Sequence, residues 1–461
     1  MIYPAALLLV CACLGLAVVG RIGVLAAGGI LIPMEMAAAV SLGGASVNVA
    51  DLYYLIVAAY VTISFFASGN LQVSRSVRLP LAICVYAIFA TLILPQVFAG
   101  KVLVFSVSGE SGVRVSSRYL ASLVPLHFSM SNISQLFYTL AVMVYVILFA
   151  HEARRRGAAV LERILVLATL SHAAMSLAEA VGLDLSFLRT ADYRDLGQAS
   201  VLGSRRIVGM FAEASTAGVF SSASLAYFAF RFLASSRPLH FVLAAIMAAL
   251  TLATLSSTAF AGLAAFAAFL VVRSVFAQKT KSRGKRLLLL AVFLVLVLLG
   301  FLLFSGDGSR ATGFLTRLVL DKGASRSGLE RAAWTVHGWQ LFKATYGLGV
   351  GAGSTIANSL LIVWLANFGL IGTVLYLLLV ARALPGRGRV ETAAEPSIYP
   401  AALAGFCTLL GAMMASHTLP NLQISFALFL TLCISTRPIR LSRRMESRRQ
   451  GGAGCDPAML V

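Results

Sequence analysis

The stretch GSTIANSLLIVWLANFGLIGTVLYLLLV, residues 353–380, contains no charged side chain. A helix that crosses the hydrocarbon core of a membrane needs about 20 predominantly apolar residues in a row. Similar runs recur along the 461 residues, of which 59% are hydrophobic and only 12% are charged. Soluble globular domains do not have this composition. The sequence therefore predicts an all-α polytopic membrane protein in which residues 1–461 form a single integral membrane domain.

About thirteen transmembrane helices, within a range of about 12 to 14, are expected from the lengths of the apolar runs. A transmembrane β-barrel is excluded because barrel strands alternate in polarity, whereas these runs are apolar throughout. The predicted spans are 4–20, 22–41, 51–68, 79–98, 132–150, 159–182, 207–233, 238–256, 258–277, 287–305, 353–380, 398–416 and 420–436.

The distribution of lysine and arginine predicts the orientation in the membrane. With thirteen spans, all the short basic segments fall on one face, which the positive-inside rule makes the cytoplasmic face. The N-terminus is then outside and the basic tail, 437–461, is inside. The same rule accounts for much of the net charge of +20, so no nucleic-acid partner is expected. The basic segments are the loops near Arg75 and Arg78, 151–157, 278–286 and 381–389, and the tail.

Three long loops, 99–131, 183–206 and 306–352, are predicted on the outer, periplasmic face, and they carry many arginines. Cations on this side are disfavoured, and an anionic ligand is a common reason for them. Arginine suits phosphate because its planar fork donates two parallel hydrogen bonds and stays charged. A lipid-linked pyrophosphate would supply the matching anion. The alternative is that the arginines are solvated loop charges paired with nearby acids.

The first local pattern lies at 205–213, where Arg205 and Arg206 precede Glu213. If the helix begins near 207, Glu213 lies about two turns below Arg206 on the same face, about 10 Å along the axis. An acid at that depth in a membrane is costly and is treated as functional by default. Glu213 is then either a base toward a sugar hydroxyl or part of a buried structural ion pair.

The second pattern is an amphipathic helix at 325–344, expected to lie on the outer membrane face. It carries Arg326, Arg331 and Trp334. Arg326 lies four residues from Glu330, and a helical ion pair between them is the alternative to ligand binding. Trp334 is either an interfacial anchor or a ring that stacks on a sugar.

Alternating glycines follow this helix, at Gly347, Gly349, Gly351 and Gly353. Their backbone amides could cradle an oxyanion at the start of the next helix. No strand precedes them, so a nucleotide-binding loop is excluded, and no Cys/His cluster has metal-ligand spacing. No metal and no cofactor are therefore expected. His417, at the outer end of a predicted span, is either a second base or a packed histidine.

The run Arg-x-x-Gly-x-Phe-x-Glu (Arg206, Gly209, Phe211, Glu213), and the later Gly-x-Gly-x-Gly-Ser before Asn358 and GLIGTVLYLLL, resemble the bacterial O-antigen ligase and polymerase superfamily. The resemblance covers roughly residues 205–380. It implies a GT-C-like helical bundle with a large periplasmic loop that contains an amphipathic helix. It also implies that Arg206, with Arg326 or Arg331, binds the donor pyrophosphate and that Glu213 lies in the same cavity.

One position departs from the family. Its ligases usually carry a His-Asn pair after the glycine turn, whereas Ala357 precedes Asn358 here. The resemblance therefore favours a polymerase of undecaprenyl-pyrophosphate-linked oligosaccharide repeats, in the bacterial inner membrane with its active site facing the periplasm, serving O-antigen, capsule or exopolysaccharide synthesis. A chain-length regulator, export machinery and membrane lipids are the expected partners. A ligase, a flippase for lipid-linked sugars and a non-catalytic membrane partner remain alternatives.

The expected functional residues come from these patterns together. Catalysis is assigned to Glu213, Arg206 and Arg326. Substrate binding is assigned to Arg205, Arg331, Trp334, Gly349, Gly351, Asn358 and His417.

Overall fold

A computed structural model of the protein describes residues 2–19, 23–42, 45–67, 77–107, 113–114, 122–190, 206–276, 326–385 and 398–437. These residues are mostly helical, with 13 α-helices. The strands among them are short and form a two-stranded sheet, β1-β2, and a three-stranded sheet with the order β3-β5-β4.

Seven of the described helices are long and apolar enough to cross a membrane. Four more helices are apolar, but their apolar stretches are shorter. The chain is therefore a membrane-embedded helical protein, as the sequence predicted. The seven are α4 (Arg78–Val97), α5 (Met130–Arg156), α6 (Ala159–Ala180), α7 (Ala214–Ser235), α9 (Ser257–Phe276), α13 (Leu360–Ala381) and α14 (Ile398–Ser416); the shorter four are α1 (Pro4–Val19), α3 (Val49–Ala67), α8 (Pro238–Ala253) and α15 (Ile424–Thr436).

The predicted span at 22–41 is wrong. The chain there forms the short α2 (Val24–Ala27), the 3₁₀-helix η1 (Gly28–Leu31) and the strand β1 (Ala38–Leu42), which pairs with β2 (Ala45–Asn48). Two glycines in η1 allow close packing: a Cβ at Gly28 would lie 2.7 Å from the Tyr53 ring of α3, and one at Gly29 would overlap the carbonyl of Ile164 on α6.

Three other predicted spans begin later than expected, because residues 206–213, 353–359 and 420–423 are not helical. The helix predicted at 207–233 starts only at Ala214, and Glu213 is its N-cap, with φ −141° and ψ 153°. Glu213 is therefore exposed at a helix end rather than two turns inside a helix. The predicted span 287–305 and the predicted tail from 438 onward lie outside the described residues.

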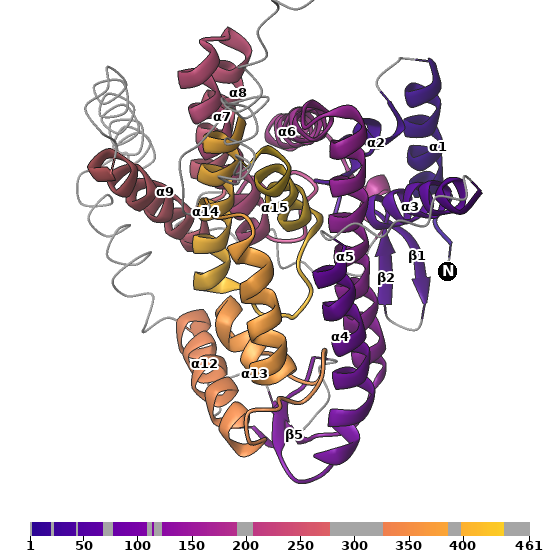
Figure 1. The fold of residues 1–461 in the computed structure, drawn as a ribbon, viewed down its shortest axis with the longest axis vertical. Helices are drawn as coiled ribbons and strands as arrows, with labels where there is room; N and C mark the ends of the chain where they lie inside the picture. Colours follow the sequence, from indigo (N-terminus) through magenta and orange to yellow (C-terminus); the bar gives the residue numbers. More distant parts are fainter. Residues whose placement is uncertain are drawn as a thin grey trace, which may run out of the picture.

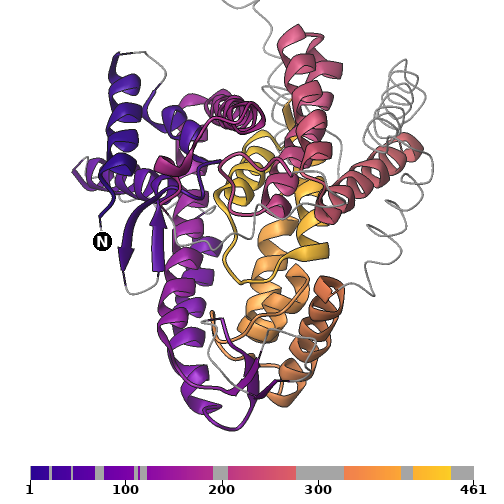
Figure 2. The ribbon, with the colours of Figure 1, turned by 180° about the vertical axis from the view of Figure 1, so that it is seen from behind.

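Helix α7 lies at the centre of one half of the molecule, packed against α8, α9 and α14. Small residues let these helices approach closely, as is usual in membranes: a Cβ at Gly218 of α7 would lie 2.7 Å from the Cβ of Ala259 on α9. Figures 1 and 2 show α4 and α5 along the other side of the molecule, with β5 (Ser122–Pro125) at their lower end.

Helices α12 (Arg326–Ala344) and α13 lie together near that lower end, and α7 and α8 reach the opposite end (Figure 1). The helix predicted at 325–344 is confirmed in α12. It packs along α13, where a Cβ at Gly338 would lie 2.7 Å from Ile362. It also packs beside β3 (Leu103–Phe105), because Nε2 of His337 lies 2.9 Å from the carbonyl oxygen of Leu103.

Candidate functional site

The candidate site is built around residues 206–213, named here the arginine segment. Its backbone amides have no helical partners, so other groups must accept their hydrogen bonds. The amides of Val208 and Gly209 donate to Oε2 of Glu179 on α6, at 2.9 and 2.7 Å. The amide of Ala212 donates to Oε2 of Glu35, at 3.2 Å. Two carboxyl groups from distant parts of the chain therefore hold the segment.

Further backbone hydrogen bonds fix the start and the middle of the arginine segment. The amide of Ile207 donates to the carbonyl of Ala253, at the end of α8, at 3.1 Å, and the carbonyl of Met210 accepts from the amide of Met36 at 3.0 Å. The guanidinium of Arg189 lies 3.6 Å from the carboxylate of Glu179. Both side chains of this pair also contact the backbone of Gly209, from the α6 side of the segment.

The glycine and phenylalanine of the Arg-x-x-Gly-x-Phe-x-Glu run shape the segment. Gly209 has φ +63°, where a side chain would be strained, and a Cβ there would lie 3.0 Å from Oγ of Ser176 on α6. The Phe211 ring packs edge-on against His172, with centroids 4.9 Å apart. The two residues turn the backbone and bury its middle, which leaves the polar side chains at the two ends of the segment.

Arg206, at one end of the segment, is held by main-chain oxygens. Its Nε donates to the carbonyl of Thr254 at 3.0 Å, and Nη2 lies 3.4 Å from that of Leu255. Burial lowers the pKa of Arg206; nearby Glu213 opposes this shift and nearby Arg331 adds to it. Arg331, on α12, is therefore near enough for its charge to act on Arg206, although the two are far apart in the sequence.

These charges are not neutralised by direct pairing. Among the described residues, no carboxylate lies within ion-pair distance of Arg206 or Arg331. Glu213 accepts a hydrogen bond from Oγ of Ser215 at 2.8 Å and is otherwise exposed. Arg206, which binds the α8–α9 turn, therefore has a second guanidinium group and one accessible carboxylate within electrostatic range.

A second set of predicted residues lies further along α12. Nδ2 of Asn358 donates to Oγ1 of Thr335 at 3.4 Å. Nε1 of Trp334 and Oδ1 of Asn358 are buried and have no hydrogen-bond partner. An unpaired buried donor and an unpaired buried acceptor therefore lie on the two sides of the contact between α12 and the start of α13.

His417 lies next to this set through the backbone, because the amide of Ala357 donates to the carbonyl of Thr418 at 3.3 Å. Nε2 of His417 lies 3.0 Å from the carbonyl oxygen of Asn421. Burial lowers the pKa of His417 to about 4, although hydrogen bonds to Asn421 and Leu419 oppose the shift. The imidazole is therefore neutral near pH 7 and already engaged, as in a packed histidine.

The glycine loop does not offer the anion cradle that the sequence suggested. The amide of Gly349 donates to Oγ1 of Thr345, and that of Gly351 donates to the carbonyl of Asn367. Both residues are buried, and a Cβ at Gly351 would lie 2.9 Å from the carbonyl oxygen of Ala90 on α4. These glycines instead let the loop pass closely between α4 and α13.

Two predicted residues cannot be placed in the site. Arg205 lies outside the described residues, and for Arg326 only the helical backbone is described. The structure adds Glu35, Glu179 and Arg189, which sequence reasoning had not assigned to the site. The available signal was an acid inside an apolar stretch, and both Glu35 and Glu179 have that property.

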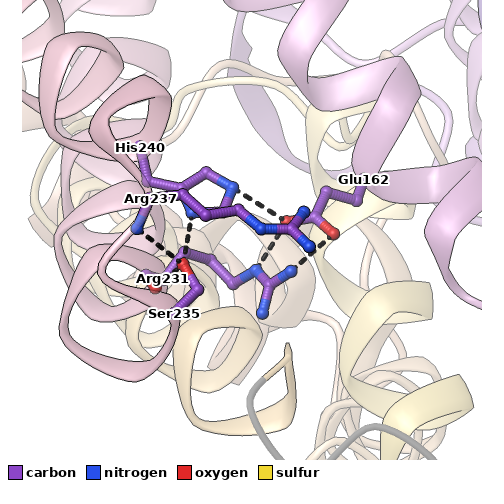
Figure 3. Close-up of polar contacts among 5 residues, drawn as sticks. All are labelled: Glu162, Arg231, Ser235, Arg237 and His240. Atoms are coloured by element: carbon purple, nitrogen blue, oxygen red, sulfur yellow. Dashed lines mark hydrogen bonds and ion pairs between the residues drawn. The ribbon is translucent and has the colours of Figure 1, made fainter.

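A separate polar cluster lies at the far end of α7 and joins it to α6 and α8 (Figure 3). Arg231 pairs with Glu162, and His240 lies 3.6 Å from the same carboxylate. Oγ of Ser235 bonds Nδ1 of His240 at 2.8 Å and donates to the carbonyl of Arg231. Because its charges are paired with each other, this cluster is a structural connection.

No three or more His, Cys, Asp or Glu side chains come together as a metal site within the described parts of the chain. Comparison of the chain with family models, curated proteins and solved structures found no match.

Proposed function

We propose that the protein is a membrane glycosyltransferase that polymerises undecaprenyl-pyrophosphate-linked oligosaccharide repeats at the periplasmic face of the bacterial inner membrane. The observation that carries the proposal is that Arg331 and Glu213 both lie within electrostatic range of Arg206. Two unneutralised guanidinium groups suit a pyrophosphate, because each can donate two parallel hydrogen bonds to it. The family resemblance of the arginine segment supports the same reading.

In this proposal the arginines act on the leaving group. A hydroxyl of the incoming repeat attacks the anomeric carbon of the growing chain, and the bond from that carbon to the pyrophosphate oxygen breaks. The bonding electrons leave with the pyrophosphate, whose growing charge Arg206 and Arg331 stabilise; such electrostatic stabilisation is usually the largest catalytic effect. Glu213 accepts the hydroxyl proton, a contribution of about 10²- to 10⁴-fold. A single displacement inverts the anomeric centre.

The unpaired groups on α12 and before α13 suit the sugar. Nε1 of Trp334 is a donor and Oδ1 of Asn358 an acceptor, and each is buried without a partner. A sugar hydroxyl can satisfy either group. The indole ring adds an apolar face on which a sugar can stack. We place the sugar adjacent to the pyrophosphate in this part of the site.

The proposed orientation follows the positive-inside rule. Arg154, Arg155 and Arg156 end α5, and Arg237 lies in the α7–α8 turn. Gly23, after α1, lies beside Arg156, since a Cβ there would be 3.9 Å from its Nη1. We assign this basic end to the cytoplasm, which places the end that carries β5 in the periplasm (Figure 1).

A flippase for lipid-linked sugars is the second candidate. Buried acids within membrane helices are typical of proton-coupled transport, and Asp51 on α3 and Glu179 on α6 are both buried. A ligase would use the same pyrophosphate chemistry with a different acceptor. The three functions predict different accumulated intermediates, so one experiment separates them.

The test uses cells that lack the chain and are complemented with wild type, Arg206→Ala or Arg206→Lys. Surface polysaccharide and lipid-linked oligosaccharides are measured together. Single repeats on lipid without long polymer support a polymerase; full-length polymer held on the lipid carrier indicates a ligase, and repeats retained in the cytoplasmic leaflet indicate a flippase. Arg163→Ala, an exposed arginine on α6, is the control and should leave polymer unchanged. Unchanged polymer in Arg206→Ala would overturn the proposal.

A further inference from the structure

Glu35 lies outside the transmembrane helices, in the turn between η1 and β1, yet it reaches the proposed site. Its Oε2 accepts the amide hydrogen of Ala212, the residue directly before Glu213, at 3.2 Å. The next residue, Met36, donates its amide to Met210 and accepts from the amide of Thr190, each at 3.0 Å. The turn that carries Glu35 is therefore hydrogen-bonded both to the arginine segment and to the loop after α6.

The charges around Glu35 are mostly negative. Asp51 on α3 and Glu213 both lie close enough to raise the pKa of Glu35, and burial raises it more than either. The hydrogen bond from Ala212 acts in the opposite direction, and the resulting pKa is about 8. Glu179 and Arg189, which contact the arginine segment from the α6 side, are paired with each other.

We infer that Glu35 is a positioning residue of the proposed site: its carboxyl group fixes the backbone just before Glu213, and its charge state sets how negative the surroundings of Glu213 are. The inference rests on the proposed function, because the role of Glu213 comes from that proposal. It adds a residue from the N-terminal quarter of the chain to a site whose proposed catalytic and substrate-binding groups all lie beyond residue 205.

The protonation state of Glu35 has a direct consequence for an anionic donor. Near pH 7 the carboxyl group is mostly neutral, and Glu213 is the negative group beside Arg206. Above pH about 8 a second negative charge appears next to Glu213. That charge repels a pyrophosphate and competes for the arginines. Transfer should therefore decline as the pH rises through this range.

Two substitutions of Glu35 separate its hydrogen bond to Ala212 from the charge of its carboxyl group. Glu35→Gln keeps an oxygen that accepts from Ala212 and cannot ionise, so it should retain polymer formation. Glu35→Ala removes the bond to Ala212, and the resulting displacement of Glu213 should lower polymer formation by about tenfold or more. Asp184→Ala is the matched control: Asp184 also accepts a backbone amide, that of Ser186, but it is exposed in the loop after α6. It should leave polymer unchanged.

Infrared titration of the purified protein tests the charge state without an assay for activity. We expect a protonated carboxyl band that disappears as the pH rises through about 8 and that is missing in Glu35→Gln. In membranes that contain their own lipid-linked sugars, the alkaline decline in polymer formation should also be missing in Glu35→Gln. A band identical in wild type and Glu35→Gln would overturn the charge part of the inference.

The cell experiment distinguishes the inference from the proposed function. If Arg206→Ala leaves polymer unchanged, the proposed function fails. If Arg206→Ala removes polymer but Glu35→Ala does not, the proposed function stands and the positioning role of Glu35 fails. Loss of polymer in Glu35→Ala with normal membrane levels of the protein, and retention in Glu35→Gln, is the expected result.

Discussion

The carboxylate of Glu162 on α6 forms a two-point ion pair with the guanidinium of Arg231 on α7, with nitrogen–oxygen distances of 2.5 and 2.9 Å (Figure 3). Both side chains are nearly buried, at 14% and 8% exposed. The pair joins two helices that have few other contacts with each other, at the end of α7 opposite Glu213. It therefore connects the basic end of the bundle to the helix that begins at the proposed site.

Removal of one partner should destabilise the protein strongly. Arg231→Met leaves Glu162 buried without its partner, which typically costs about 3 to 5 kcal/mol. The double variant Glu162→Leu with Arg231→Met should recover much of this loss, because no charge is then left buried. Thermal unfolding in detergent measures both. Arg163→Met, the same substitution at an exposed neighbour on α6, should change stability by less than about 0.5 kcal/mol. Equal effects at both positions would contradict the prediction.

Gly353 should not tolerate a side chain. Its φ is +76°, and a Cβ would overlap the carbonyl oxygen of Ser131 at the start of α5. Gly353→Ala should therefore cost at least about 1 to 3 kcal/mol of stability. Gly15→Ala is the control, since Gly15 lies in α1 with open space around it, and alanine there should stabilise the helix by roughly 0.5 to 1 kcal/mol. The two unfolding temperatures should move in opposite directions.

His417 should make the protein less stable in acid. Its ordinary pKa is 6.5 and burial lowers it to about 4 in the folded protein. Below pH 6.5 the unfolded chain binds a proton that the folded protein does not, so stability falls until the pH reaches about 4. The loss is on the order of 1 to 3 kcal/mol. His417→Gln should reduce this slope, measured as the difference in unfolding free energy between pH 7 and pH 5. Parallel pH curves would refute the assignment.

Arg331 should need its guanidinium group and not only its charge. Arg331→Lys keeps a cation but loses the bidentate fork, so we expect about a tenfold or larger loss of polymer, close to that of Arg331→Ala. Polymer length and amount in complemented cells provide the measurement. Full activity of the lysine variant would mean that Arg331 acts only as a point charge.

The orientation can be tested by cysteine labelling. Lys101, after α4, and Arg237, in the α7–α8 turn, are both exposed. Helix α4 reaches the end of the molecule that carries β5, whereas α7 and α8 reach the opposite end (Figure 1). In a background without native cysteines, Lys101→Cys should react with a membrane-impermeant maleimide in intact cells with a permeable outer membrane. Arg237→Cys should react only after the inner membrane is opened. The reverse pattern would place the proposed site in the cytoplasm.

Hydropathy predicted most of the membrane helices well but missed their exact ends. The run that contains residues 360–380 was easily recognised, because apolar side chains partition into lipid whatever the neighbouring segments do. The starts of α7 and α13 were wrong because the residues before them are apolar yet not helical. Amides in these residues donate to groups far away in the sequence, such as Glu179 for Val208 and Phe105 for Ile356. A local sequence pattern does not indicate such distant hydrogen-bond acceptors.

The candidate site, like the membrane helices, could be predicted from the sequence only in part. The sequence singled out Arg206, Glu213 and Arg331 through charge in unusual places, but it set Glu213 too deep and gave the glycines a binding role. It overlooked Glu35 because a single acid in an apolar region has no spacing that links it to Ala212.

Composition and the length of the apolar runs are enough to predict a helical membrane protein whose arginines stand out from an apolar background. Which of these groups come within range of one another depends on tertiary packing. Helix α12, which packs along α13, brings Arg331 within electrostatic range of Arg206. Glu213 is exposed because two distant carboxyl groups hold the preceding backbone out of a helix. Such contacts depend on packing between segments, which the order of residues along one segment does not specify.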